Sequence, residues 1–475
     1  LMEITSPAYV ILFVVSVFVF YRVNPKYRIL LLTILSAGFI ASLNLLLLAY
    51  IIAYTLINYY LGFKINDSHQ KVTFFRLGIF FNLIQIILLK YSTFAIDPLL
   101  NLIGLRIELS KLSEIILPIG ISYFTLQGIG YLINIKNGWE KPEKDFLYFF
   151  QYIIFFPKFL SGPVERSNHF LPQLRKNINI SDLYLADGAK LVLIGYFKKV
   201  AIANQLSSYA LSVYSFDQAG GCLSWVLFII QPLYLYFDFS GYTDIALGIS
   251  KMFGIDLLPN FQRPFFAENV TTFWKRFHMS LSSWFNDYIF RPTSFKYRRW
   301  GIKASLYAML ITWTLFGIWH GAGWTFMLIG LLQAFAISYE FFTKKIRLKI
   351  FEGVPIIITR WFGRLITYLF YCVSLVFFFS PDVKSAMTFI AGLSSFSGPS
   401  PFMDLSIKPF QLIIYVPLVL FIEFLRNDHQ DIYERFLTFW SGKNQKYIRW
   451  TVYSVMITII YISGFKSVQF IYANF

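Results

Sequence analysis

Long apolar stretches recur along the whole chain, and they constrain its fold more than any other feature of the sequence. Stretches of about 17–25 apolar residues are long enough to cross a bilayer core of roughly 30 Å as helices. The 475-residue chain is 57% hydrophobic and 14% charged, whereas soluble domains are about 25% charged. The alternating pattern of a membrane β-barrel is absent from the sequence. These features predict an all-α, polytopic integral membrane protein.

The net charge of +17 comes from Lys and Arg residues that lie between the apolar stretches. In a soluble domain this excess would suggest nucleic-acid binding. Here the positive-inside rule accounts for it, because the cytoplasmic loops of membrane proteins are rich in Lys and Arg. The alternation of basic and non-basic loops places residues 344–364 and 426–449 inside and residues 380–408 outside. We therefore expect membrane lipid around this chain, and no nucleic acid.

The apolar stretches predict about eleven spans, with re-entrant and interfacial pieces, in a single domain over residues 1–475. Residues 8–20 have no basic region before them, which favours a retained first helix over a removed signal peptide. Residues 27–61 are too long for one span, and small and polar residues within them predict a break into two helices. The aromatic run 146–160 ends in Pro and Lys, so it is predicted to be re-entrant or interfacial.

Two of the five histidines lie between residues 273 and 324 in an aromatic neighbourhood. On a helix with about 100° per residue, residues 274–288 place Trp274, His278 and five other large apolar side chains on one face. This pattern predicts a helix lying in the membrane interface, with His278 on its buried face. The opposite, polar face carries three further site candidates: Arg276, Asn286 and Asp287. A buried histidine often only hydrogen-bonds across a core, so a packing role for His278 stays open.

Residues 302–319 predict a spanning helix, and His320 follows it after Trp319, toward the outer side of the membrane. Imidazole is the side chain best suited to moving a proton near neutral pH. A histidine at membrane depth is a candidate for a proton relay or a catalytic base. The small residues at 321–323 leave room for a substrate or another backbone.

The apolar stretch 223–253 carries four polar residues that are further candidates for the site: Asp238, Ser240, Tyr242 and Asp244. A carboxylate at membrane depth indicates a functional site or a structural ion pair. Asp238 is the better functional candidate of the two acids, and a hydrogen-bonded structural role is an equal alternative.

The motifs of several enzyme classes do not occur in the sequence. There is no G-x-S-x-G elbow, HExxH motif or P-loop, which argues against hydrolases, metalloproteases and ATPases. A buried histidine acting as general base could instead deprotonate a hydroxyl, which would attack an activated acyl group directly. That reaction needs no metal and no nucleophile from the enzyme.

A series of ordered segments resembles the membrane-bound O-acyltransferase (MBOAT) family, closest to its bacterial alginate O-acetylation branch. Proteins of D-alanyl transfer to teichoic acid are more distant relatives. The segments that carry the resemblance are residues 117–131, 155–165, 195–203, 236–264, 273–292, 319–324 and 470–472. The resemblance implies a ring of helices around a tunnel, with His320 as the catalytic residue and His278 as a second functional histidine.

The resemblance also implies the substrates and surroundings. The acyl donor would be a cytoplasmic thioester such as acetyl-CoA or an acyl carrier protein, with no tightly bound cofactor. The acceptor would be an extracytoplasmic polysaccharide, reached directly or through a periplasmic acetyltransferase-like partner. The location would be the inner (cytoplasmic) membrane of a bacterium.

Two alternatives stay open on the sequence. D-alanyl transfer to teichoic acid would predict a small acidic carrier that docks on a basic cytoplasmic face. A proton-coupled transporter or polysaccharide-export channel would use His320 and Asp238 as a proton relay. Inverted repeats would favour transport, and the sequence shows none.

Overall fold

The computed structural model describes residues 4–104, 111, 120–160, 162–176, 182–207, 222–394 and 409–464. Throughout these ranges the regular structure is helical, and extended backbone pairs only in an isolated bridge between Phe261 and Phe277. The all-α prediction is confirmed. Four segments that carried predictions lie wholly or partly outside the described residues: 117–131 at its start, 155–165 at residue 161, 380–408 at its end, and 470–472.

Six of the described helices are long and apolar enough to cross a membrane, which confirms the polytopic prediction. They are η1 with α2 (Pro25–Leu43), α3 (Leu45–Asp67), α4 (Lys71–Lys90), α17 (Ile302–His320), α18 (Trp324–Ile350) and α19 (Ile356–Phe379). Helix α1 (Pro7–Arg22) is apolar but shorter. The total of about eleven spans stays a prediction.

The chain divides into two compact units, each described here by itself. Unit 1 contains residues 1–192, 242–259 and 472–475, and unit 2 contains 193–241 and 260–471. Among the described residues, the division falls within α11 (Asp182–Tyr196), within α13 (Cys222–Met252) and between residues 259 and 260 in a non-helical segment. A single domain over the whole chain stays our prediction.

The remaining elements within residues 4–176 of unit 1 are η2 (Ser92–Ile96), α5 (Asp97–Leu102), α7 (Ile121–Lys136), α8 (Phe146–Ile154), α9 (Phe156–Phe159) and α10 (Ser167–Arg175). The predicted break within 27–61 lies at Asn44, whose extended backbone ends α2 and whose side chain accepts a hydrogen bond from the Leu47 amide. Asn is a favoured N-cap because its side chain satisfies an amide that has no partner within the helix.

Interhelical hydrogen bonds and small residues join α3, α4 and α7 in unit 1. Tyr54 donates to Asn82 at 2.7 Å, and Asn82 donates to Asn58 at 2.8 Å. A Cβ atom at Gly128 of α7 would lie 2.1 Å from the Tyr54 hydroxyl oxygen. The small residue therefore lets α7 approach α3 closely, as small residues do between membrane helices.

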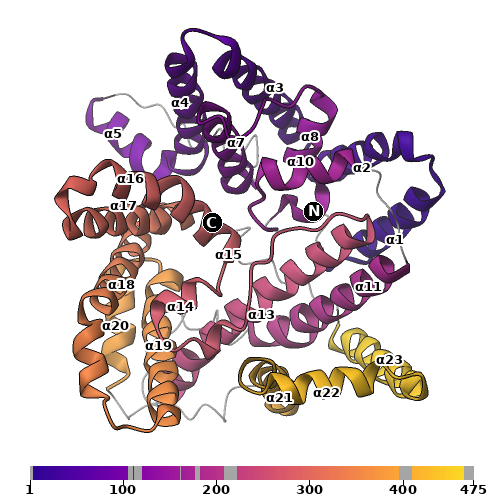
Figure 1. The fold of residues 1–475 in the computed structure, drawn as a ribbon, viewed down its shortest axis with the longest axis vertical. Helices are drawn as coiled ribbons and strands as arrows, with labels where there is room; N and C mark the ends of the chain where they lie inside the picture. The colour runs from indigo at the N-terminus through magenta and orange to yellow at the C-terminus, as the bar shows by residue number, and fades with distance from the viewer. Residues whose placement is uncertain are drawn as a thin grey trace. The chain divides into compact units, whose positions relative to one another are not determined.

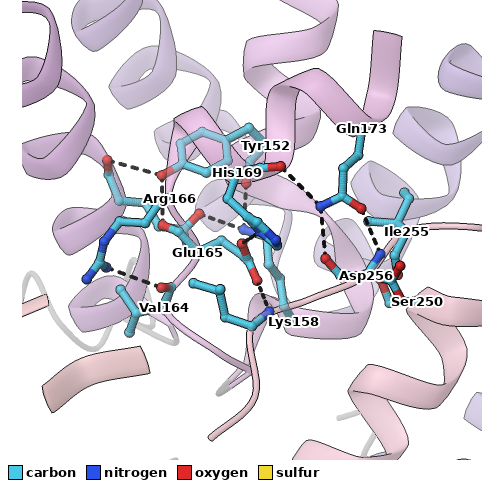
Figure 2. Close-up of polar contacts among 12 residues, drawn as sticks. Tyr152, Lys158, Val164, Glu165, Arg166, His169, Gln173, Ser250, Ile255 and Asp256 are labelled. Carbon is cyan, nitrogen blue, oxygen red and sulfur yellow. Dashed lines mark hydrogen bonds and ion pairs between the residues drawn. The ribbon is translucent and has the colours of Figure 1, made fainter. Parts of the chain in front are cut away.

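Buried polar contacts fix the segment predicted to be re-entrant, which forms the short helices α8 and α9 rather than one span (Figure 2). Lys158 is buried and donates to the Gln127 side chain and to the Tyr152 carbonyl oxygen, both at 2.6 Å. The buried Glu165 carboxylate accepts a hydrogen bond from the Leu258 amide and contacts His169 at 2.9 Å. These contacts satisfy charges that would be costly to bury alone.

Unit 2 contains the longer helices of the C-terminal half. Its further elements are η3 (Phe197–Ala203), η4 (Pro264–Phe266), α14 (Val270–Trp274), α15 (Met279–Phe285), η5 (Asn286–Phe290), α16 (Arg291–Lys296), η6 (Arg298–Trp300), α20 (Val383–Gly392), α21 (Pro409–Asp428), α22 (Gln430–Ser441), η7 (Lys443–Gln445) and α23 (Lys446–Ser463). Helix α18 packs against α19, and α19 packs against α20. These three helices are drawn in orange in Figure 1.

Helices α17 and α18 form a tight antiparallel pair at two glycines. A Cβ atom at Gly317 would lie 2.2 Å from the Phe326 carbonyl oxygen, and one at Gly330 would lie 2.2 Å from the Trp313 carbonyl oxygen. Both opposing atoms belong to the backbone and cannot rotate away. This contact fixes the end of α17, where His320 lies.

Replacing Gly317 with alanine is therefore expected to destabilise the protein. The added methyl group must separate two helix backbones, and overpacking of this kind costs about 1–3 kcal/mol. The thermal transition of detergent-solubilised protein measures the effect. Gly38→Ala in α2 is the matched control, because a Cβ at Gly38 meets nothing within 4 Å. Equal transitions for the two variants would contradict the close approach at Gly317.

Candidate active site

His278 lies in a strained turn rather than inside a helix. Helix α14 ends at Trp274, and α15 begins at Met279 directly after His278. His278 has φ 48° and ψ 48°, the left-handed region that costs energy for any residue with a side chain. The predicted continuous helix over residues 274–288 is therefore wrong, because local helical periodicity cannot anticipate a turn imposed by another segment.

The prediction that His278 is buried is nevertheless confirmed, since its exposed fraction is 0%. The predicted aromatic face is buried as well, including Trp274, Phe277 and Trp284. Their burial is compatible with the turn between α14 and α15 and does not require one continuous helical arc. The helical periodicity of the sequence thus predicted which side chains are buried, although the continuous helix from which it predicted them is not formed.

The break also separates the polar candidates. Arg276 donates to the Asn427 side chain at 2.9 Å. Asp287 lies in η5, where it accepts a hydrogen bond from Asn286 at 3.1 Å and contacts Arg291 at 3.4 Å. Arg276 thus lies before α15 and Asp287 after it, in different elements rather than on one continuous helix.

The two histidines lie close together in unit 2. His320 is the last residue of α17, and its ring centroid is 6.5 Å from that of His278. The Trp319 ring contacts both, at 6.1 Å from His278 and 4.9 Å from His320. Charge alternation and helical angles did not show this proximity, because it depends on how α17 packs against the 275–278 turn.

Aromatic side chains surround the histidine pair. Phe239 of α13 meets His278 edge-on at 4.7 Å, while Phe316 and Phe378 contact His320 at 4.9 and 5.7 Å. Burial lowers the pKa of His278 to about 3. The apolar surroundings thus disfavour the protonated form of the His278 ring.

The small residues after His320 accommodate a side chain. A Cβ at Gly321 would lie 2.2 Å from the Phe326 ring, and Phe326 in turn packs edge-on against Phe378. The sequence predicted room for a substrate or another backbone at this point. The space beside Gly321 instead holds an aromatic ring that supports the cage around His320.

Two polar residues of α18 position the candidate site, and the sequence analysis did not identify either. Trp274 donates from its indole nitrogen to Gln333 at 2.9 Å, and Gln333 donates to Ser374 of α19 at 2.9 Å. The Glu340 carboxylate accepts hydrogen bonds from the Val270 and Thr271 amides at the start of α14. The available signal was two polar residues seven apart, on one face of the predominantly apolar stretch 324–342 of the helix.

A cavity of about 560 Å³ lies beside the histidine cage. Its apolar wall includes Trp274, Phe285, Trp313 and Phe316. Phe316 contacts the His320 ring and also Trp274, so the cavity wall is continuous with the cage. Neither histidine is among the residues that line the cavity.

The polar part of the cavity wall is basic. Lys275 and Arg291 line it together with Ser282, Ser283 and Asn286, and none of the lining residues is acidic. Trp274 and Asn286 are the predicted site residues that the cavity brings together. Among the described residues, no group of three or more His, Cys, Asp or Glu side chains could hold a metal ion.

The acid predicted to be the stronger candidate in α13 forms a buried ion pair. Asp238 contacts the Lys199 ammonium of η3, and their exposed fractions are 0% and 1%. Ser240 is buried, in unit 2, whereas Tyr242 and Asp244 belong to unit 1. The structural role that was the alternative for Asp238 is thus supported by a specific ion-pair partner, Lys199. The sequence did not predict this pairing.

Comparison with known proteins decides the family. The model of MBOAT, the membrane-bound O-acyltransferase family, matches residues 26–380. The chain belongs to this family. The match includes the 275–278 turn, the aromatic cage and both histidines of this membrane-bound O-acyltransferase family member.

Three relatives show the range of similarity. A probable alginate O-acetylase from Azotobacter vinelandii is 31% identical over 342 residues, which cover 69% of this chain and 66% of the relative. A peptidoglycan O-acetyltransferase from Helicobacter pylori is 30% identical over 417 residues, covering 80% and 76%. A teichoic acid D-alanyltransferase from Bacillus subtilis is 32% identical over 236 residues, covering 48% and 60%. The chain thus spans just under two thirds of the first relative's length.

Proposed function

We propose that this protein is an O-acyltransferase, most simply an O-acetyltransferase, that acylates a polysaccharide outside the cytoplasm. The observation that carries the proposal is the pair of buried histidine rings, 6.5 Å apart in one aromatic cage. Membership of the MBOAT family and the names of the O-acetylating relatives support the same reaction class. They favour group transfer over the alternative of proton-coupled transport.

In the proposed reaction, His320 is the general base. Its imidazole takes the proton of an acceptor hydroxyl as the oxygen attacks the carbonyl carbon of an acyl thioester. The carbon–oxygen bond forms, the carbon–sulfur bond breaks, and the His320 imidazolium returns the proton to the departing thiolate. His278, whose ring centroid is 6.5 Å from that of His320, would support this step by hydrogen bonding.

The cavity beside the cage supports binding of the donor. Its apolar wall suits an uncharged acyl and pantetheine-like arm, and Lys275 and Arg291 suit a phosphate. Acetyl-CoA and a carrier-protein thioester share this chemistry. We propose one of these as the donor, a bacterial inner membrane as the location, and a periplasmic acetyltransferase-like protein as a partner.

The test is to delete the gene and measure what mild alkali releases from the cell's polysaccharides. We expect ester-linked acetate to fall and to return when the gene is restored. Loss of ester-linked D-alanine instead would favour the reaction named for the Bacillus subtilis relative. Unchanged esters with altered polymer export would contradict group transfer and favour a transporter.

Replacing His278 with alanine is expected to lower the acylation rate about 10²-fold, the effect typical of losing one hydrogen-bonding group from a buried reaction site. The initial rate of acyl transfer in membranes, normalised to folded protein, measures this. An unchanged rate would assign His278 to packing alone.

A further inference from the structure

We propose that Asn260 is a positioning residue for His278, holding it in the strained turn that places its ring beside His320. The inference rests on the proposed function, because it assigns a supporting residue to the proposed reaction. Asn260 is in unit 2 and has an exposed fraction of 0%. It lies 18 residues before His278, within the segment 236–264, and is not among the site candidates predicted from the sequence.

The position of His278 creates the need for such a residue. His278 is the N-cap of α15, and its side chain makes no capping hydrogen bond. The first amides of a helix have no partners within the helix, and an N-cap side chain normally satisfies one of them. Since the His278 ring lies in the aromatic cage, another residue must supply the cap.

Asn260 supplies it from a distant part of the chain. Its side-chain oxygen accepts hydrogen bonds from the Ser280 amide at 3.3 Å and from the Ser280 hydroxyl at 2.5 Å. Its backbone oxygen accepts from the Met279 amide at 2.9 Å. One residue thus satisfies the two amides that directly follow His278.

The residues after Asn260 hold the other side of the turn. The Gln262 amide donates to the Arg276 carbonyl oxygen at 2.9 Å, and Phe261 pairs with Phe277 in the isolated bridge. His278 therefore lies between two anchored segments, and its backbone cannot relax from the left-handed region without breaking them. Strain of this kind persists only where the surrounding structure imposes it.

A double-mutant cycle between Asn260 and His278 tests the proposal. With His278 present, Asn260→Ala is expected to lower kcat about tenfold or more. In the His278→Ala background, it should lower kcat less than about twofold, because there is no ring left to position. An equal loss in both backgrounds would show a general structural role and overturn the proposal.

Chemical modification gives a readout that does not depend on activity. Diethylpyrocarbonate modifies exposed imidazole, and mass spectrometry locates the product. We expect His278 to be protected in the wild-type protein and modified about tenfold faster in Asn260→Ala, because the turn opens locally. Unchanged protection of His278 would overturn the proposal. Lack of acyl transfer by the wild-type protein would overturn the proposed function. In that case the rate at which diethylpyrocarbonate modifies His278 would still decide whether Asn260 holds the turn.

Two further variants separate positioning from stability. Asn44→Ala removes an N-cap asparagine in α3, so it should lower the thermal transition without changing the modification of His278. If Asn260→Ala does not fold, Ser280→Ala removes only the hydroxyl that donates to Asn260. It is expected to increase modification of His278 in the same direction by a smaller factor, and no increase would count against the proposal.

Discussion

Replacing His320 with alanine is expected to leave a folded membrane protein that no longer O-acylates its acceptor. The ring ends α17 inside the cage formed by Trp319, Phe316 and Phe378. Alanine removes the proposed base and leaves the backbone of the helix intact. Loss of a general base typically lowers a rate about 10²–10⁴-fold. We therefore expect the content of ester-linked acyl groups on the polysaccharide to fall to that of cells without the gene.

The measurement compares ester-linked acyl groups on the polysaccharide in cells that produce equal amounts of folded protein. His429→Ala is a matched control, because His429 is exposed at the start of α22, outside the proposed site. It should leave acylation unchanged. Full acylation by His320→Ala would show that His320 is not the catalytic base. Failure of this variant to fold would show instead that His320 is needed for the stability of the core.

The second large effect concerns the ion pair between Lys199 and Asp238. Both side chains are almost completely buried, so replacing Asp238 with alanine leaves an ammonium group without its counter-ion. Breaking a buried pair from one side typically costs about 3–5 kcal/mol. We expect Asp238→Ala to lower the thermal transition and the yield of monodisperse protein sharply, with Lys199→Met acting in the same direction.

The double variant Lys199→Met with Asp238→Leu should recover much of the lost stability, because both charges are removed together. Asp287→Ala is the matched single control, since that carboxylate is 38% exposed in its ion pair with Arg291 and should change stability little. Normal stability with abolished acyl transfer in Asp238→Ala would reverse the assignment and make Asp238 a functional residue.

Several local features could be predicted from the sequence because their causes lie within a few residues. Helix length and apolar content predicted α17 closely, and the break at Asn44 follows from a residue that both ends one helix and caps the next. Burial of His278 followed from the periodicity of its neighbours.

The sequence by itself determined the class of protein, a polytopic helical membrane protein, and selected His278 and His320 as the side chains to examine. Both depend on local composition and on which residue types can move a proton. Only the tertiary structure decided the 6.5 Å separation of the two rings, the Lys199 partner of Asp238 and the turn imposed by Asn260. Each joins residues 18 to 42 positions apart in the chain, and helical periodicity carries no information about contacts over such separations.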